Sequence, residues 1–183
     1  MGKTEIRIGG FGGQGVILSG FIIGKASAIF DSRFATMIQS FGPEARGGAC
    51  NAQVIISDTP VLYPYTTIPD ILVIMSQEAY NKFGSNVKRG GTILLESDLV
   101  KVDDIDKSLK VYSIPATHLA EELGRKIVLN IVMVGFFTAV TNIVSYDSIK
   151  KSILDSVPKG TETININAFE KGFQYGKEIL LHS

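Results

Sequence analysis

A glycine-rich segment, Gly10-Phe11-Gly12-Gly13-Gln14-Gly15, is the first feature of the sequence whose residue types and spacing could do chemistry. It has the spacing G-x-G-x-x-G and lies between a short apolar run typical of a strand and a longer one typical of a helix. Glycines let the backbone approach a phosphate closely, and the unpaired amides at a helix N-terminus favour negative charge. Gln14 adds a neutral donor and acceptor. The turn therefore suits an anion.

A dinucleotide enzyme would also carry an Asp or Glu about twenty residues further on, at the end of the second strand, where it binds the ribose hydroxyls. Here the second strand candidate ends in Met37-Ile38-Gln39-Ser40. Asp31 comes before that strand, and Glu44 lies in a separate loop after Pro43. The sequence therefore disfavours NAD and FAD. It leaves open a phosphate of another ligand, the backbone of a partner, or close packing of the first strand and helix with no ligand.

A second charged segment, Gly42-Pro43-Glu44-Ala45-Arg46-Gly47-Gly48, follows the second strand candidate, so we expect it at the same sheet edge as the glycine turn. Arg46 offers a planar fork suited to carboxylate or phosphate, and Glu44 could orient it. The alternative is an exposed turn with an ion pair worth under about 1 kcal/mol. The spacing does not choose between these two interpretations.

Other residues with reactive side chains are few and are expected to be structural. His118 opens a helix candidate, His182 lies near the C-terminus, and neither Ser19 nor Cys50 has a base nearby in sequence. Cys50 should point into the core as a small apolar side chain. Asn130 lies in an apolar helix candidate, where an amide must be hydrogen-bonded, so it either pins a loop or faces a ligand.

The composition limits the class of protein. A length of 183 residues fits one domain, and 18 basic residues balance 18 acidic ones, which argues against nucleic acid or a membrane surface as partner. The single cysteine excludes an internal disulfide and a four-cysteine zinc or iron–sulfur site built from this chain. The N-terminal segment lacks the pattern of a signal peptide, so we expect a cytoplasmic location. Part of the apolar excess, with a mean hydropathy of +0.22, could lie in a subunit interface.

Strand and helix candidates alternate along the chain, and this alternation predicts a parallel sheet. We expect one α/β domain over residues 1–183, with a mostly parallel sheet, helices on both faces, a Rossmann-like first strand-turn-helix and a helical C-terminal third. The expected strands are 5–9, 34–39, 50–57, 71–75, 92–96 and 109–114. The expected helices are 16–30, 77–83, 117–123, 128–143, 145–156 and 167–181.

Two helix starts carry recognisable capping residues. Thr117 could cap the helix 117–123, and Asn167 with Glu170 has the spacing of a capping box. The uncharged run Ile127–Val144 is long enough to raise a transmembrane interpretation. Asn and Thr residues interrupt it, so we expect instead a core helix buried between the sheet and a partner subunit.

Two segments of the chain resemble the gamma subunit of 2-oxoacid:ferredoxin oxidoreductases. They are Ile8-Gly9-Gly10-Phe11-Gly12-Gly13-Gln14-Gly15 and Ser40-Phe41-Gly42-Pro43-Glu44-Ala45-Arg46-Gly47-Gly48. The glycine turn is shared with other nucleotide folds, but its pairing with Gly-Pro-Glu-x-Arg-Gly about thirty residues later is specific to this family. The resemblance covers nearly the whole chain.

The resemblance implies a subunit that is not active by itself. Such complexes convert a 2-oxoacid and coenzyme A into acyl-CoA and carbon dioxide and pass electrons to ferredoxin. Because this sequence has no Gly-Asp-Gly motif and no cysteine set, alpha, beta and possibly ferredoxin-like delta subunits would supply thiamine diphosphate, magnesium and iron–sulfur clusters. The resemblance places Gly12, Gly13, Gln14 and Gly15 at the phosphates of coenzyme A. It places Glu44 and Arg46 at the active-site cleft or a neighbouring subunit.

Departures from the family pattern indicate the substrate. Pyruvate and branched-chain members tend to have His-Gly-Arg-Gly-Gly-Gln-Gly and Gly-Pro-Glu-Arg-Arg-Gly-Ala-Pro. Here Gly10-Phe11 replaces the basic turn, Ala45 replaces an Arg, and Ala49-Cys50-Asn51-Ala52 resembles the 2-oxoglutarate type. The resemblance thus favours 2-oxoglutarate. Pyruvate, branched-chain and indolepyruvate members, or a stand-alone Rossmann-type nucleotide-binding protein, are the alternatives.

Overall fold

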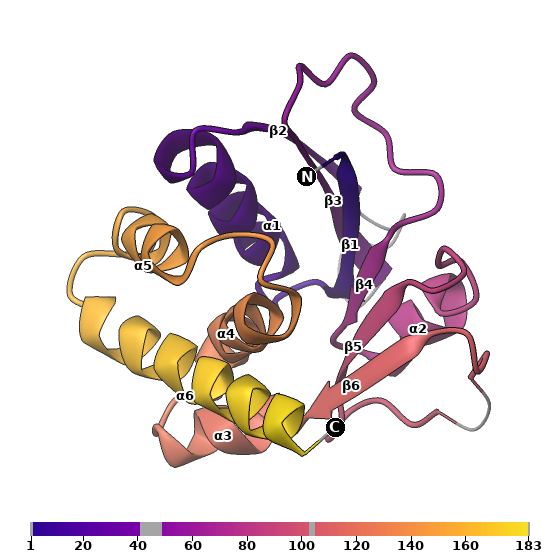
Figure 1. Ribbon diagram of the computed structural model, residues 1–183. Coiled ribbons are helices and arrows are strands. Elements are labelled where there is room, and N and C mark those ends of the chain that lie inside the picture. Colours follow the sequence, from indigo (N-terminus) through magenta and orange to yellow (C-terminus); the bar gives the residue numbers. More distant parts are fainter. Residues whose placement is uncertain (1, 41–48, 103–104, 183) are drawn as a thin grey trace.

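A six-stranded sheet in the order β2-β3-β1-β4-β5-β6 runs through the computed structural model, which describes residues 2–40, 49–102 and 105–182 (Figure 1). The strands are β1 (Thr4–Phe11), β2 (Phe34–Ser40), β3 (Ala49–Ser57), β4 (Ile71–Ile74), β5 (Thr92–Glu96) and β6 (Lys110–Ile114). The helices are α1 (Val16–Lys25) with its π-helical continuation η1 (Ala26–Phe30), α2 (Gln77–Phe83), α3 (Ala116–Glu122), the 3-10 turn η2 (Lys126–Val128), α4 (Leu129–Thr141), α5 (Tyr146–Leu154) and α6 (Glu162–Leu181). Glu44 and Arg46 lie outside the described residues.

The sheet is mostly parallel, as expected, with β3 as the exception. Strands β1, β4, β5 and β6 pair with one another in parallel, in that order. Strand β3 pairs antiparallel with both β1 and β2, so β2 runs in the direction of β1. The chain makes this arrangement with a β2–β3 hairpin, which needs no crossover helix. The predicted α/β class, Rossmann-like start and helical C-terminal third are confirmed.

Helices cover both faces of the sheet, but unequally. Ile6 and Ile8 of β1 point to the face packed by α1, α3 and α4, with α5 and α6 completing that core. Leu72 and Ile74 of β4 point to the opposite face, where α2 supplies Phe83. All four residues of β4 are buried, because both of its faces are covered.

Helix α4 is the buried centre of the larger core. Every residue from Leu129 to Ala139 is buried, and α6 covers the helix on the side away from the sheet (Figure 1). Burial was expected for the uncharged run, but its cover is α6 of the same chain and not a partner subunit. Within the described ranges, no helix is both long and apolar enough to cross a membrane.

Glycines allow α4 and α6 to approach backbone to backbone. A Cβ atom on Gly135 would overlap the carbonyl oxygen of Phe169, and one on Gly172 would overlap that of Val132. Small residues at these positions therefore set the distance between the two helices.

Both predicted caps are wrong. Helix α3 begins one residue earlier, at Ala116, and the amide of Thr117 donates to Glu96 Oε1 at 2.8 Å, so a carboxylate from β5 supplies the cap. Helix α6 begins at Glu162, which places Asn167 inside it. The first turn of α6 is stabilised by Asn165, whose side chain donates to the carbonyl of Thr161 at 2.8 Å. This contact is not part of a capping box, so the capping-box spacing did not indicate the true start of the helix.

We expect Gly172→Ala to lower the free energy of unfolding by about 3 kcal/mol, because a methyl group would have to push two helix backbones apart. Urea denaturation measures this. Gly24→Ala in α1 is the matched control, since its added Cβ would make an ordinary contact of 3.7 Å with Val54. That variant should be unchanged or about 0.5–1 kcal/mol more stable. Equal effects in both variants would contradict the close helix contact.

Candidate functional site

The glycine turn joins β1 to α1 at the carboxyl edge of the sheet. Gly13 has φ 100° and Gly15, the N-cap residue of α1, has φ 72°, and both angles favour glycine. The amide of Gln14 donates to the carbonyl of Phe11 at 3.2 Å and closes the turn.

The side chain of Gln14 fastens this turn to the neighbouring strand. Its Oε1 accepts from the amide of Phe11 at 2.9 Å, and its Nε2 donates to the carbonyl of Met75, just after β4, at 2.7 Å. The side chain is 5% exposed. The amide is therefore engaged inside the chain, and an anion at the turn would meet backbone groups.

Asn130 of α4 lies behind the turn. Its Nδ2 is 3.4 Å from the carbonyl oxygen of Gly15, which also accepts from Ser19 Oγ at 3.1 Å. A Cβ atom on Gly15 would come within 2.5 Å of the Asn130 amide. Of the two roles left open by the sequence, Asn130 therefore has the first: it pins the loop.

Gly12 and Gly13 form the open side of the turn. Both are exposed, and a Cβ atom on either would meet no other described atom within 4 Å. Gly13 needs its positive φ, whereas Gly12 has no such angle. Packing against the described residues therefore gives no reason for glycine at position 12. A side chain there would only obstruct something that approaches from outside.

The two strands that flank the second motif meet at this same edge. Phe11 of β1 pairs with Ala49 at the start of β3, and Ser40 at the end of β2 pairs with Asn51. The segment that carries Glu44 and Arg46 therefore leaves β2 and enters β3 beside the glycine turn. Those two side chains lie outside the described residues.

The strand order also explains the missing ribose acid. In a dinucleotide-binding fold the second strand lies beside the first, so its terminal acid reaches the ligand. Here β3 separates β2 from β1. An acid at the end of β2 would therefore be one strand too far from the glycine turn to bind a ribose there. The strand order thus argues against NAD in addition to the missing acidic residue.

Glu96, at the carboxyl end of β5, is a buried acid that the sequence analysis did not single out. Its side chain is 0% exposed and accepts from the amides of Leu99 at 2.7 Å and Thr117 at 2.8 Å. Burial raises its pKa, and the hydrogen bonds oppose that rise only in part. The sequence signal that could have identified Glu96 is a charged residue at the end of an apolar run. Through its bond to Thr117, Glu96 orients α3 at the edge that also holds the glycine turn.

Cys50 and His118 have surroundings that fit the structural roles expected for them. Cys50 lies in the core, where burial raises the pKa of its thiol. His118 is exposed and lies 3.2 Å from Glu122. Over the part of the chain that the structure describes, no group of three or more His, Cys, Asp or Glu side chains could hold a metal ion.

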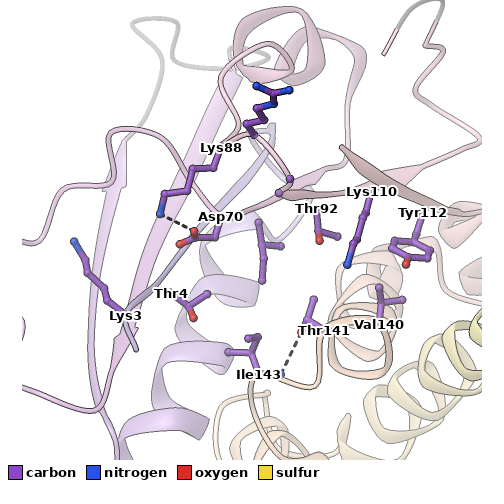
Figure 2. Close-up of a pocket in the computed structure, with 14 residues that line it drawn as sticks. Lys3, Thr4, Asp70, Lys88, Thr92, Lys110, Tyr112, Val140, Thr141 and Ile143 are labelled. Atoms are coloured by element: carbon purple, nitrogen blue, oxygen red, sulfur yellow. Dashed lines mark hydrogen bonds and ion pairs between the residues drawn. The ribbon is translucent and has the colours of Figure 1, made fainter. Parts of the chain in front are cut away.

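A basic cavity of about 430 Å³ lies at the opposite, amino edge of the sheet. Figure 2 shows Lys88 reaching Asp70, with an Nζ–Oδ1 distance of 2.7 Å, and Lys110 pointing toward the end of α4 near Thr141. Helices that run antiparallel to the strands end at this edge, and cations there complement their C-terminal dipoles. The basic side chains thus have a structural explanation, and sequence reasoning missed the cavity because its lining comes from distant segments.

An α/β domain with a nucleotide-type turn at its carboxyl edge is the class that this geometry defines. Residues 5–175 match the family model of the pyruvate ferredoxin/flavodoxin oxidoreductases. The chain belongs to this family.

Curated relatives and solved structures agree with this assignment. A 2-oxoglutarate synthase subunit of Methanocaldococcus jannaschii is 51% identical over 97% of this chain and 96% of its own length. A pyruvate synthase subunit of the same organism is 35% identical over 83% of this chain and 85% of its own length.

Two solved structures superpose closely on the fold. The gamma subunit of a keto/oxoacid ferredoxin oxidoreductase from Geobacter sulfurreducens has a TM-score of 0.84 and 39% identity, covering 94% of this chain and 98% of its own. The 2-oxoglutarate:ferredoxin oxidoreductase of Magnetococcus marinus, with 2-oxoglutarate, coenzyme A and succinyl-CoA bound, has a TM-score of 0.86 and 25% identity. This chain is 97% covered there but matches only 32% of that longer chain.

We expect Gln14→Met to lower the free energy of unfolding by about 1–3 kcal/mol, because the amide of Phe11 and the carbonyl of Met75 would lose their partner in a buried place. Chemical denaturation tests this. Gln77→Met is the control, since the Gln77 amide also makes two hydrogen bonds but in an exposed position. Its loss should stay within about 0.5 kcal/mol. A stable Gln14→Met would contradict the fastening role.

The variant Glu96→Gln tests how the buried carboxyl group makes the free energy of unfolding depend on pH. Because the folded-state pKa is raised above the ordinary 4.5, the folded protein holds this proton more tightly than the unfolded one. That contribution is complete below the ordinary value and is lost as pH rises through the raised pKa. The stability of the wild type relative to Glu96→Gln should therefore fall with rising pH, as measured by urea unfolding in a pH series. A relative gain would mean that hydrogen bonds outweigh desolvation.

Proposed function

We propose that this chain is a non-autonomous subunit of a thiamine diphosphate-dependent complex that oxidatively decarboxylates 2-oxoglutarate to an acyl-CoA, with ferredoxin as electron acceptor. Higher identity to the 2-oxoglutarate synthase subunit than to the pyruvate synthase subunit supports the choice of substrate. The departures at Gly10-Phe11 and Ala45 point the same way. Pyruvate, branched-chain or indolepyruvate oxidation is the alternative within the family. A cytoplasmic location stays part of this proposal.

The open glycine at position 12 is the observation that carries the site. With Gly13 exposed beside it and the N-terminus of α1 directly behind, a phosphate group can reach backbone amides that no described side chain covers. We assign this place to the phosphates of coenzyme A, with Gly15 pinned by Asn130 and Gln14 holding the turn in shape. The neighbouring motif would bring Glu44 and Arg46 to the active-site cleft, where Arg46 supplies the cation that the turn itself lacks.

The cofactors of the reaction would be held by partner chains. The one cysteine of this sequence is buried in the core and cannot ligate a cluster without unfolding. The sequence also has no thiamine-type metal motif. Thiamine diphosphate, magnesium and iron–sulfur clusters therefore belong on alpha, beta and possibly delta subunits. This chain would contribute binding surface for coenzyme A and no redox centre of its own.

Reconstitution tests the role of the chain. The complex assembled from alpha, beta and delta candidates with this chain should oxidise 2-oxoglutarate in the presence of coenzyme A and reduce ferredoxin, and it should prefer 2-oxoglutarate to pyruvate. Full activity in a preparation that lacks this chain would contradict the proposal. A preference for pyruvate would reassign the substrate and leave the subunit role intact.

Gly12→Val tests the coenzyme A site within the complex. We expect the KM for coenzyme A to rise at least about tenfold, which corresponds to about 1.4 kcal/mol of lost binding, with kcat changed little. The unfolding free energy of the isolated chain should change little, because a Cβ atom at this position meets no described atom within 4 Å. Gly2→Val, at another glycine with open surroundings, is the control and should alter neither quantity. An unchanged KM in Gly12→Val would remove the assignment.

A further inference from the structure

Strand β2 forms one end of the sheet, and its outer edge has no partner strand among the described residues. Its sequence, Phe34-Ala35-Thr36-Met37-Ile38-Gln39-Ser40, contains no charge and no proline. Proteins usually protect a free edge with lysine, proline, a bulge or a covering segment, because its open amides and carbonyls can pair with another chain. Seven uncharged strand residues without such protection indicate an edge that is covered in the assembled protein.

The sheet face toward α1 is hollowed beside β2. A groove of about 400 Å³ lies between the helical residues Phe21, Ala28 and Ile29 and the strand residues Ala35 and Met37. Phe21 is 48% exposed and Ile29 is 65% exposed, which is unusual for large apolar side chains that lie together.

Lys25 is the one charged residue among those that line this groove. Its ammonium group is engaged by Asp155 at 2.6 Å. The groove therefore offers apolar contact area and no free charge.

The opposite sheet face is also hollowed beside β2. A second hollow, of about 560 Å³, is lined by the β2 residues Met37 to Ser40, Gln53 of β3 and Tyr65, and it shares Met37 with the first groove. Tyr65 is 55% exposed, and its ring lies tilted against that of Tyr63, itself 63% exposed, with a centroid distance of 5.4 Å. This hollow is aromatic and polar but uncharged.

The segment that carries the two tyrosines is fixed to the sheet. Thr66 donates its amide to Gln53 Oε1 at 2.8 Å, and its carbonyl accepts from Nη2 of the buried Arg7 at 2.8 Å. The aromatic wall is thus held at β2–β3 by contacts within the chain, with its rings left in solvent.

An extended strand is the ligand that fits a free edge with a hollow on each face. Added to β2, its backbone would satisfy the open hydrogen-bonding groups, and alternate side chains would fill the two hollows. The side chains toward Phe21 and Ile29 would be apolar, and those toward Gln53 and Tyr65 would be uncharged polar or aromatic.

We propose that the free edge of β2 pairs with such a strand from a larger subunit of the same complex, the one that corresponds to the rest of the longer Magnetococcus marinus chain, an inference that rests on the proposed function. The Magnetococcus marinus enzyme supports this occupant, because the matching domain there is about a third of one longer chain and is therefore covalently joined to the rest of it. Ser40 at the end of β2 pairs with Asn51, and Phe11 before the glycine turn pairs with Ala49 of the same strand, so a strand on β2 also brings the larger subunit toward the turn.

Hydrogen–deuterium exchange on the purified complex and on the isolated full chain tests the pairing. Amides of residues 35–39 that do not bond β3, every second one along the strand, should exchange at least about tenfold more slowly in the complex, as expected for newly paired strand amides. Unchanged exchange in a complex that forms and turns over would overturn the interface and leave the proposed function standing. Failure of the chain to associate with the larger subunit at all would overturn both.

Ile29→Lys and Ile127→Lys form a matched pair of variants. Both isoleucines are exposed, at 65% and 72%, and both lie in short helical turns, but only Ile29 lines the groove. We expect Ile29→Lys to weaken association with the larger subunit at least about tenfold and Ile127→Lys less than about twofold, measured by titration. Equal effects would overturn the proposal.

A second copy of this chain is the other occupant that the edge of β2 could take, and sedimentation of the isolated chain measures whether such a homodimer forms. A β2-to-β2 homodimer that persists in the complex, detected by cross-linking a cysteine placed with Met37→Cys, would overturn the proposal in favour of a second copy of this chain. Cross-linking of that cysteine to the larger subunit supports it.

Discussion

The amide of Gln14 joins the two strands on which the rest of the molecule depends. By accepting from the amide of Phe11 and donating to the carbonyl of Met75, it ties the end of β1 to the end of β4. The chain leaves β1 toward one face of the sheet and β4 toward the other, so these ends border the crevice where α/β folds bind ligands. A hydrogen-bonded side chain buried there keeps the crevice in one shape before any ligand arrives.

Helix α4 carries the turn from behind. Asn130, the second residue of α4, contacts Gly15, and its place is set by the packing of this mostly apolar helix between the sheet and α6. The glycines that bring α4 and α6 together therefore act on the site at a distance, because they fix the depth at which Asn130 sits. The packing of α4 against α6 thus helps to set the position of the glycine turn.

Two surfaces of the domain have no role in packing among the described residues. One is the open backbone at Gly12 and Gly13, and the other is the uncharged edge of β2 with its apolar groove. Both lie near the β2–β3 connection, on the same part of the fold. A subunit that supplies a binding edge to a larger enzyme would expose its surfaces in this way, and an apolar composition with zero net charge is compatible with burial against another protein.

The sequence by itself determined the local elements and the family. Residues 77–83 and 92–96 form the helix and strand that their patterns predict, and the helical path from Val16 to Phe30 is continuous as α1 and η1, because periodicity and turn chemistry act between neighbours in the chain. Only the tertiary structure decided that β3 separates β1 from β2, that Glu96 caps α3, and that Asn130 and Gln14 hold the glycine turn. The hydrogen bond between Glu96 and Thr117 joins residues 21 positions apart, and that between Gly15 and Asn130 joins residues 115 positions apart. Only the bond between Gln14 and Phe11 is local. Such pairings depend on strand order and helix packing, which no short sequence pattern encodes.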